Sequence, residues 1–272
     1  MILKFILFLI IINIYLYFII KRKFLKKNEF KIINKKCKIK LKKIGNNKKV
    51  IEIHDFFKLI NGVTEFFYLN KYNLKVPTES MYPGSRFNIH NKIENEILNF
   101  MLLINKKYFK FKGEIYEYSC VYSVPDFNEN KFCLLNSIPH RDNDIYRQGL
   151  AITIYLCNEN PNYGGTIIYD FKNNNDYETV NSILNDKKSK KKKFDINVTN
   201  KFFKIIHNAE LKFNKAVIYP MFYWHNINIL PKNFNHNKNR LTITAFLTFE
   251  NYLENDKMFY ENYKILESKY YL

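Results

Sequence analysis

The chain has 272 residues, of which 47% are hydrophobic, so it can bury one sizeable core and is not expected to be disordered. Its formal net charge of +19 comes from two short segments: residues 21–50 contain 14 Lys or Arg against one acidic residue, and residues 187–193 contain six Lys. The remainder is close to neutral, which disfavours a uniformly basic nucleic-acid-binding surface.

The first 20 residues are almost entirely apolar, and Lys21, Arg22 and Lys23 follow at once. A helix needs about 20 apolar residues to cross a bilayer. No small-residue cleavage site follows the run, so we expect residues 1–20 to be an uncleaved transmembrane anchor. Residues 21–49 would then be a basic juxtamembrane linker. The positive-inside rule predicts a single-pass protein with its domain in the cytosol, and a lumenal domain is the alternative.

Residues 50–272 are expected to form one mainly β domain. An amphipathic helix is predicted over residues 91–109, where apolar side chains recur at helical spacing. Many short strands with few helices before them favour an antiparallel sandwich or barrel. The predicted strands, rich in β-branched and aromatic residues, are 50–57, 64–69, 114–124, 132–142, 149–157, 166–171, 211–219 and 240–249.

Two segments lack this strand pattern. Residues 173–200 contain an Asn run and a Lys run, and a loop of this length without its own structure is unusual in a compact domain. We expect a flexible insertion there. Residues 251–272 are aromatic and charged and can form one terminal helix.

The stretch Ile138-Pro139-His140-Arg141-Asp142 carries the clearest chemical signal, with His225 lying 85 residues after His140. On a strand, His140 and Asp142 face the same side about 7 Å apart, so they can share one ligand. A third imidazole from a facing strand would complete two histidines and one carboxylate on one face of a metal, as in non-haem Fe(II) oxygenases. Asp144 is an alternative carboxylate. A hydrogen-bonded structural pair is the other interpretation of His140 and Asp142.

Five segments in chain order resemble the 2-oxoglutarate and Fe(II)-dependent dioxygenases, and the prolyl 4-hydroxylase-like branch is the most similar. The resemblance covers roughly residues 82–249 and includes Tyr82-Pro83-Gly84-Ser85-Arg86. It implies a double-stranded β-helix, or jelly-roll, core with flanking helices. The five segments are Pro139–Asp142, Ala151–Leu156, Gly164-Gly165-Thr166, Phe213–Pro220 before His225, and Arg240-Leu241-Thr242.

The resemblance implies a site residue by residue. Fe(II) would be held by His140, Asp142 and His225, with no catalytic side chain beyond these ligands. The co-substrate 2-oxoglutarate would place its distal carboxylate on Arg240, whose planar fork suits a bidentate pair, and Thr242 would add a hydroxyl donor. Ascorbate is an optional reductant.

Arg240 departs from the family spacing, because it lies 15 residues after His225, further than is usual. Lys238 is therefore the rival for the co-substrate carboxylate. We favour Arg240 because it opens an alternating strand that can face inward, whereas Lys238 lies in an Asn-rich turn.

The sequence thus predicts a membrane-anchored dioxygenase that hydroxylates a protein side chain or a small molecule. One alternative is an inactive relative that serves as a binding module. Another is a basic protein that binds a membrane surface or nucleic acid. Nucleic-acid dealkylases of the family carry a second Arg where this chain has Phe246, so a nucleic-acid substrate is disfavoured.

Overall fold

The computed structural model describes residues 32–45, 48–76, 84–90, 92–125, 132–142, 147–157, 164–173, 175–229 and 240–252. The chain divides into Met1–Lys31 and Ile32–Leu272, and all described residues lie in the second unit. Within them, no helix is long and apolar enough to cross a membrane, and this finding overturns the predicted single-pass membrane localisation. The predicted anchor itself, residues 1–20, lies outside the described residues.

Two antiparallel sheets form the framework of the described chain, so the domain is mainly β, as predicted. The larger sheet has seven strands in the order β1 (Lys38–Ile44), β2 (Lys48–His54), β8 (Ala216–Pro220), β5 (Arg147–Tyr155), β10 (Thr242–Tyr252), β4 (Ile115–Pro125) and β3 (Gly84–Asn88). The smaller sheet has the order β7 (Phe203–Ala209), β6 (Thr166–Phe171) and β9 (Trp224–Ile227).

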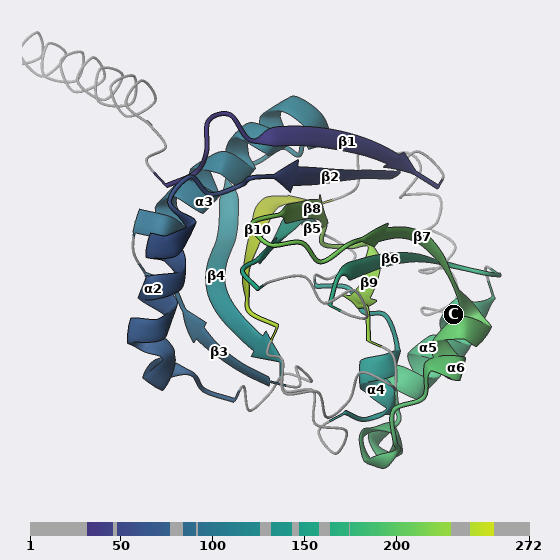
Figure 1. Cartoon of the computed structure of the whole chain (residues 1–272). Helices are drawn as coiled ribbons and strands as arrows, with labels where there is room; N and C mark the ends of the chain where they lie inside the picture. Colours follow the sequence, from purple (N-terminus) through teal and green to yellow (C-terminus); the bar gives the residue numbers. More distant parts are fainter. Residues whose placement is uncertain are drawn as a thin grey trace, which may run out of the picture. The chain divides into compact units, whose positions relative to one another are not determined.

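From β4 to β10 the chain passes back and forth between the two sheets (Figure 1). β8, β5, β10 and β4 are neighbours in the larger sheet, while β6, β7 and β9 form the smaller one. The segment around His140 joins the smaller sheet at β9 through an isolated bridge to His225. Eight segments divided between two sheets in this way are consistent with the predicted jelly-roll core.

The space between the two sheets is filled by one hydrophobic cluster. Tyr155 and Tyr219 of the larger sheet pack there with Ile168 of the smaller sheet. The opposite face of the larger sheet is covered by α2 (Ile60–Asn70) and α3 (Lys92–Ile104) (Figure 1). The phenol of Tyr122 on β4 donates a hydrogen bond of 2.8 Å to the carbonyl of Val63 in α2, which fixes that helix on the sheet.

The helix predicted over residues 91–109 is confirmed as α3, followed by a π-helical turn at Asn105–Phe109. The strand predicted over residues 64–69 is wrong, because this segment belongs to α2, where Val63 and Phe67 are buried one helical turn apart. In the segment predicted as strand 132–142, the short helix α4 (Leu134–Ser137) precedes the single bridge at His140.

Two segments expected to lack structure are ordered parts of the domain. Within the basic stretch 21–49, β1 pairs with β2 over its whole length. Residues 173–200 contain α5 (Asp176–Asn185), a 3-10 helix (Lys187–Lys191) and the start of α6 (Ile196–Phe202). These helices are held because Val180 and Phe202 pack with Ile138 and Trp224. Because residues 173–200 are rich in Asn and Lys, the sequence did not indicate the apolar contacts of Val180 and Phe202.

The β1–β2 hairpin is joined to the smaller sheet by polar contacts. Lys48 Nζ lies 2.8 Å from Asp170 Oδ1 on β6. The carboxylate of Glu52 lies 3.0 Å from His207 Nε2 on β7 and 3.3 Å from Lys215 Nζ, which is itself buried. The hairpin therefore closes one side of the space between the sheets.

Candidate metal centre

The backbone brings His140 and His225 directly opposite each other. The N–H of each residue donates to the carbonyl of the other at 2.9 Å, so their side chains lie on the same face. Their ring centroids are 4.4 Å apart. The N–H of Asp142 donates to the carbonyl of Met221 at 3.0 Å, which holds the carboxylate beside both rings.

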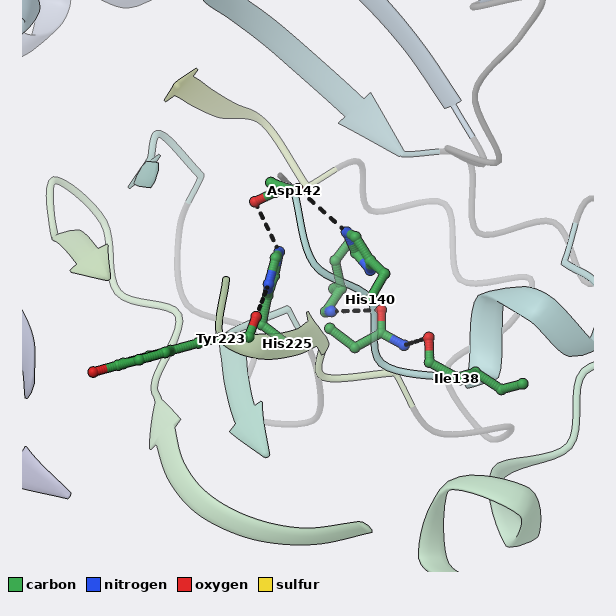
Figure 2. A network of polar contacts seen from close by, with 7 residues as sticks. Ile138, His140, Asp142, Tyr223 and His225 are labelled. Atoms are coloured by element: carbon green, nitrogen blue, oxygen red, sulfur yellow. Dashed lines mark hydrogen bonds and ion pairs between the residues drawn. The ribbon is translucent and has the colours of Figure 1, made fainter. Parts of the chain in front are cut away.

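Both imidazoles point toward the carboxylate of Asp142 (Figure 2). His225 Nε2 lies 3.1 Å from Asp142 Oδ2, and His140 Nε2 lies 3.5 Å from Asp142 Oδ1. One ligand atom from each of the three residues lies within 4.8 Å of the others. Two ligand atoms that share an ion at about 2.1 Å are roughly 3.0–3.5 Å apart in octahedral or tetrahedral geometry. The two distances to the Asp142 carboxylate fall in this range, and the three ligand atoms lie within 4.8 Å of one another, so the cluster could hold a single ion.

The hydrogen bonds around His225 leave one acceptor facing another. His225 Nδ1 lies 2.9 Å from the carbonyl oxygen of Tyr223, which can only accept, so Nδ1 carries a proton. In the neutral imidazole, Nε2 then presents a lone pair toward Asp142. Asp142 Oδ2 is buried and makes no hydrogen bond of acceptable geometry, although Nε2 is 3.1 Å away. A cation between His225 Nε2 and Asp142 Oδ2 would satisfy both atoms. The hydrogen bond to the Tyr223 carbonyl would hold the His225 ring in the orientation of a metal ligand.

The electrostatics of the cluster also favour a positive charge. Burial by itself would raise the pKa of Asp142, but the charge of His225 and the contacts with both imidazoles outweigh it and hold this pKa below its ordinary value. Burial would lower the pKa of His225, but the carboxylate of Asp142 outweighs that effect and raises it. The carboxylate is thus ionised, and it attracts a proton or a metal ion to the position between the side chains.

One side of the cluster is open. The side chain of His140 is 51% exposed, whereas that of His225 is 7% exposed. A small molecule would therefore approach the three ligands from the side of His140.

Arg240 is a buried cation beside the same interior. Its residue exposure is 4%, and its Nε donates to the carbonyl of Gly164 at 2.5 Å. Its Cζ lies 5.4 Å from the centroid of the Tyr155 ring. Among the described residues, no carboxylate lies within the 4.0 Å of an ion pair with Arg240. A buried charge without a counter-ion is costly, so this guanidinium is suited to bind an anion.

Close packing next to Arg240 requires glycine at positions 164 and 165. Gly164 has φ +105°, and a Cβ there would also overlap the side chain of Leu211. A Cβ on Gly165 would overlap the carbonyl oxygen of Ala209. The Gly-Gly pair thus places the carbonyl that holds Arg240.

Tyr219 packs against His225, and the sequence pattern assigned it no role. Its ring centroid is 4.8 Å from that of His225. Burial and then the charge of Asp142 raise the pKa of Tyr219 well above its ordinary value, while Arg240 acts in the opposite direction. The phenol of Tyr219 is therefore within electrostatic reach of both Asp142 and Arg240. Its place on β8, six residues before His225, was the available sequence signal.

The remaining predicted site residues are placed as follows. Thr242 is fully buried on β10, and its hydroxyl donates to the carbonyl of Ser123 at 3.4 Å. It lies directly opposite Tyr155, whose own hydroxyl donates to Thr166 Oγ1 at 2.8 Å. The alternatives Asp144 and Lys238 lie outside the described residues.

Several solved structures are similar to this chain. A prolyl-4-hydroxylase from Pseudomonas putida has 13% identity and a TM-score of 0.46, covering 74% of this chain and 92% of its own. The alpha-ketoglutarate-dependent carbocyclase SnoK from nogalamycin biosynthesis has 11% identity and a TM-score of 0.47, covering 74% and 80%. A prolyl 4-hydroxylase from Phytophthora capsici has 9% identity and a TM-score of 0.42, covering 76% and 60%. Because these values are low, the function has to be argued from the side chains.

Sequence comparison gives the family. No curated protein matches the chain. A family model described as "Family of unknown function (DUF6445)" matches residues 35–247, which is most of the sequence and includes His140, Asp142, His225 and Arg240. The chain therefore belongs to the DUF6445 family.

Proposed function

We propose that the chain is an Fe(II)- and 2-oxoglutarate-dependent dioxygenase that hydroxylates a protein side chain or a small molecule. The observation that carries this proposal is the cluster of His140, Asp142 and His225, in which a buried carboxylate oxygen and an imidazole nitrogen face each other without a proper hydrogen bond. Two histidines and one carboxylate with an open side form the ligand set of non-haem Fe(II) oxygenases.

Each residue of the cluster has a definite task in this proposal. His140, Asp142 and His225 would hold the ion, and the ion would supply the oxygen-activating chemistry. The carboxylate of Asp142 neutralises part of the ion's charge. The carbonyl of Tyr223 fixes the tautomer of His225, so that Nε2 faces the ion. The half-exposed side of His140 leaves room for co-substrate and substrate.

Arg240 is assigned the distal carboxylate of 2-oxoglutarate. Its Nε is engaged by Gly164, so the two terminal nitrogens remain to meet a carboxylate as a fork. Tyr155 and Tyr219 line the space between this guanidinium and the ion. In the reaction, one atom of O2 enters a substrate C–H bond and the other enters succinate, as 2-oxoglutarate loses CO2.

The test is conversion of 2-oxoglutarate to succinate by the full chain with Fe(II), ascorbate and O2, measured against His225→Ala. His90→Ala is the matched control, because His90 is an exposed histidine whose nearest charged group is Glu94. We expect succinate formation by the parent and by His90→Ala, and a loss in His225→Ala of at least the roughly 10–100-fold that removal of an outer-shell partner of a metal ligand costs. Iron binding without any succinate would instead favour an inactive binding module.

A further inference from the structure

The strand β1 lies at one edge of the larger sheet and has a partner on one side only. It is the first strand in the order of that sheet, and it pairs with β2 over all seven of its residues without a break in register. Among the described residues, no strand pairs with its other side (Figure 1). Six of its seven residues are exposed, and only Ile44 is buried. The N–H and C=O groups on the outer side of β1 are therefore open to a further strand.

The two faces of β1 differ in chemistry. Alternate residues of a strand share a face, and one face of β1 carries three exposed lysines: Lys38, Lys40 and Lys42. On the other face, Ile39 and Leu41 are 38% and 40% exposed. They lie opposite Ile53 and Ile51 of β2, which are fully buried. The apolar layer of the sheet thus continues onto an exposed edge.

The positive charge of β1 is not neutralised within the described part of the protein. No described carboxylate lies within the 4.0 Å of an ion pair with any lysine of β1. Lys40 lies directly opposite Glu52, but the Glu52 carboxylate is held by His207 and by the buried Lys215. The edge therefore presents free ammonium groups at every second residue.

Lysines on an edge strand can serve only to prevent aggregation through that edge. In β1 they are the one such device, because the strand contains no Pro and its register with β2 shows no β-bulge. A second copy of β1, added antiparallel, would place lysines opposite lysines, and like charges directly opposite each other are destabilising. A strand with carboxylates at the same positions would be attracted instead. The charge thus excludes a copy of this edge and favours an acidic strand.

We propose that the free edge of β1 binds an extended acidic segment of a partner protein as an added strand. Backbone hydrogen bonds would hold the segment, and its alternate carboxylates would lie beside the three lysines. Apolar side chains between the carboxylates would cover Ile39 and Leu41. The edge contains none of the residues proposed to bind iron or 2-oxoglutarate, so this inference does not depend on the proposed function.

The experiment measures the binding of labelled peptides to the full chain by fluorescence anisotropy. The probe is a blocked heptapeptide that alternates glutamate with valine, and its first control has glutamine in place of each glutamate. Two further peptides are N-methylated, one at the glutamate amides and the other at the valine amides. A strand added to an edge turns the amides of only one alternate set toward its partner, so each methylated peptide is the control for the other.

The protein variants change the charge of β1 and leave its backbone intact. Lys38→Glu combined with Lys42→Glu reverses two charges without adding a carboxylate opposite Glu52, and Lys38→Gln combined with Lys42→Gln only removes them. The matched control is Lys190→Glu combined with Lys191→Glu, which makes the same change in net charge on an exposed 3-10 helix. Circular dichroism checks that all variants are folded.

We expect the parent to bind the glutamate peptide at least about tenfold more tightly than the glutamine peptide, and added salt should weaken this binding because the ion pairs are exposed. Methylation of one set of amides should abolish binding, while methylation of the other set should leave it within about threefold. The charge reversal should weaken binding at least about tenfold and the charge removal several-fold, while the control variant stays within about twofold.

Three results would overturn the added strand: no detectable binding of the glutamate peptide, equal affinity for the glutamate and glutamine peptides, or equal losses with the two methylated peptides. Single-stranded DNA and anionic lipid vesicles are titrated in parallel. If either binds more tightly than the peptide and loses that binding in the charge reversal, β1 is a surface for nucleic acid or membrane and the proposal is wrong.

Discussion

Replacement of Arg240 by Gln should weaken 2-oxoglutarate binding strongly. The guanidinium is 4% exposed and has no carboxylate partner among the described residues, so a bound carboxylate would be its counter-ion. Removing one partner of a buried charge pair costs about 2–5 kcal/mol, which is at least roughly thirtyfold in affinity. Arg240→Lys should recover only part of this loss, because an ammonium cannot form two parallel hydrogen bonds with a carboxylate.

The measurement is calorimetric titration of 2-oxoglutarate into Zn(II)-loaded protein. Arg147→Gln is the control for loss of a guanidinium from the same sheet. Loss of the hydrogen bond to Gly164 should also cost about 1 kcal/mol of stability, so circular dichroism must show that the variant is folded. A folded Arg240→Gln that binds 2-oxoglutarate within threefold of the parent would refute the assignment, and Lys238 would become the residue to test.

Two further predictions concern stability. The close contact with His207 is the main cause that lowers the pKa of Glu52 from 4.5 to about 2, so Glu52 stabilises the fold above pH 4.5 and this contribution is lost as the pH falls toward 2. At 1.36 kcal/mol per pKa unit this contribution is about 3 kcal/mol. Urea unfolding of Glu52→Gln should therefore depend less on pH between about pH 2 and 4.5 than unfolding of the parent, and an equal pH dependence in the two proteins would contradict this prediction. Gly165→Ala should destabilise the fold by at least about 1–3 kcal/mol through overlap with Ala209, while Gly62→Ala in α2, with no atom near its Cβ, should stabilise it by about 0.5–1 kcal/mol. A neutral Gly165→Ala in thermal unfolding would show that this close approach is not required.

The grouping of His140 with Asp142 could be predicted because its signal is local. His140 and Asp142 are two residues apart, and the segments around them have the strand pattern of a two-sheet fold. The sequence spacing alone did not show which side-chain atoms of His140, Asp142 and His225 face one another. That depended on the bridge between His140 and His225 and on the hydrogen bond from His225 to the Tyr223 carbonyl.

Other features could not be read from the sequence because tertiary contacts decide them. The β-prone run around Phe67 becomes helical because Val63 and Phe67, one turn apart on α2, both pack against Tyr122 on the larger sheet. β3 is short and polar, so its edge pairing with β4 gave no signal.

The most direct test of the account is anaerobic Fe(II) binding by equilibrium dialysis, with His140→Ala, Asp142→Asn and His225→Ala compared with the parent. His207→Ala serves as the control for a partly buried histidine outside the cluster. The account predicts one Fe(II) per parent chain and per His207→Ala chain, and at least tenfold weaker binding in each ligand variant, with all proteins folded by circular dichroism. Equal iron occupancy in the parent and the three folded ligand variants would show that His140, Asp142 and His225 are not a metal site.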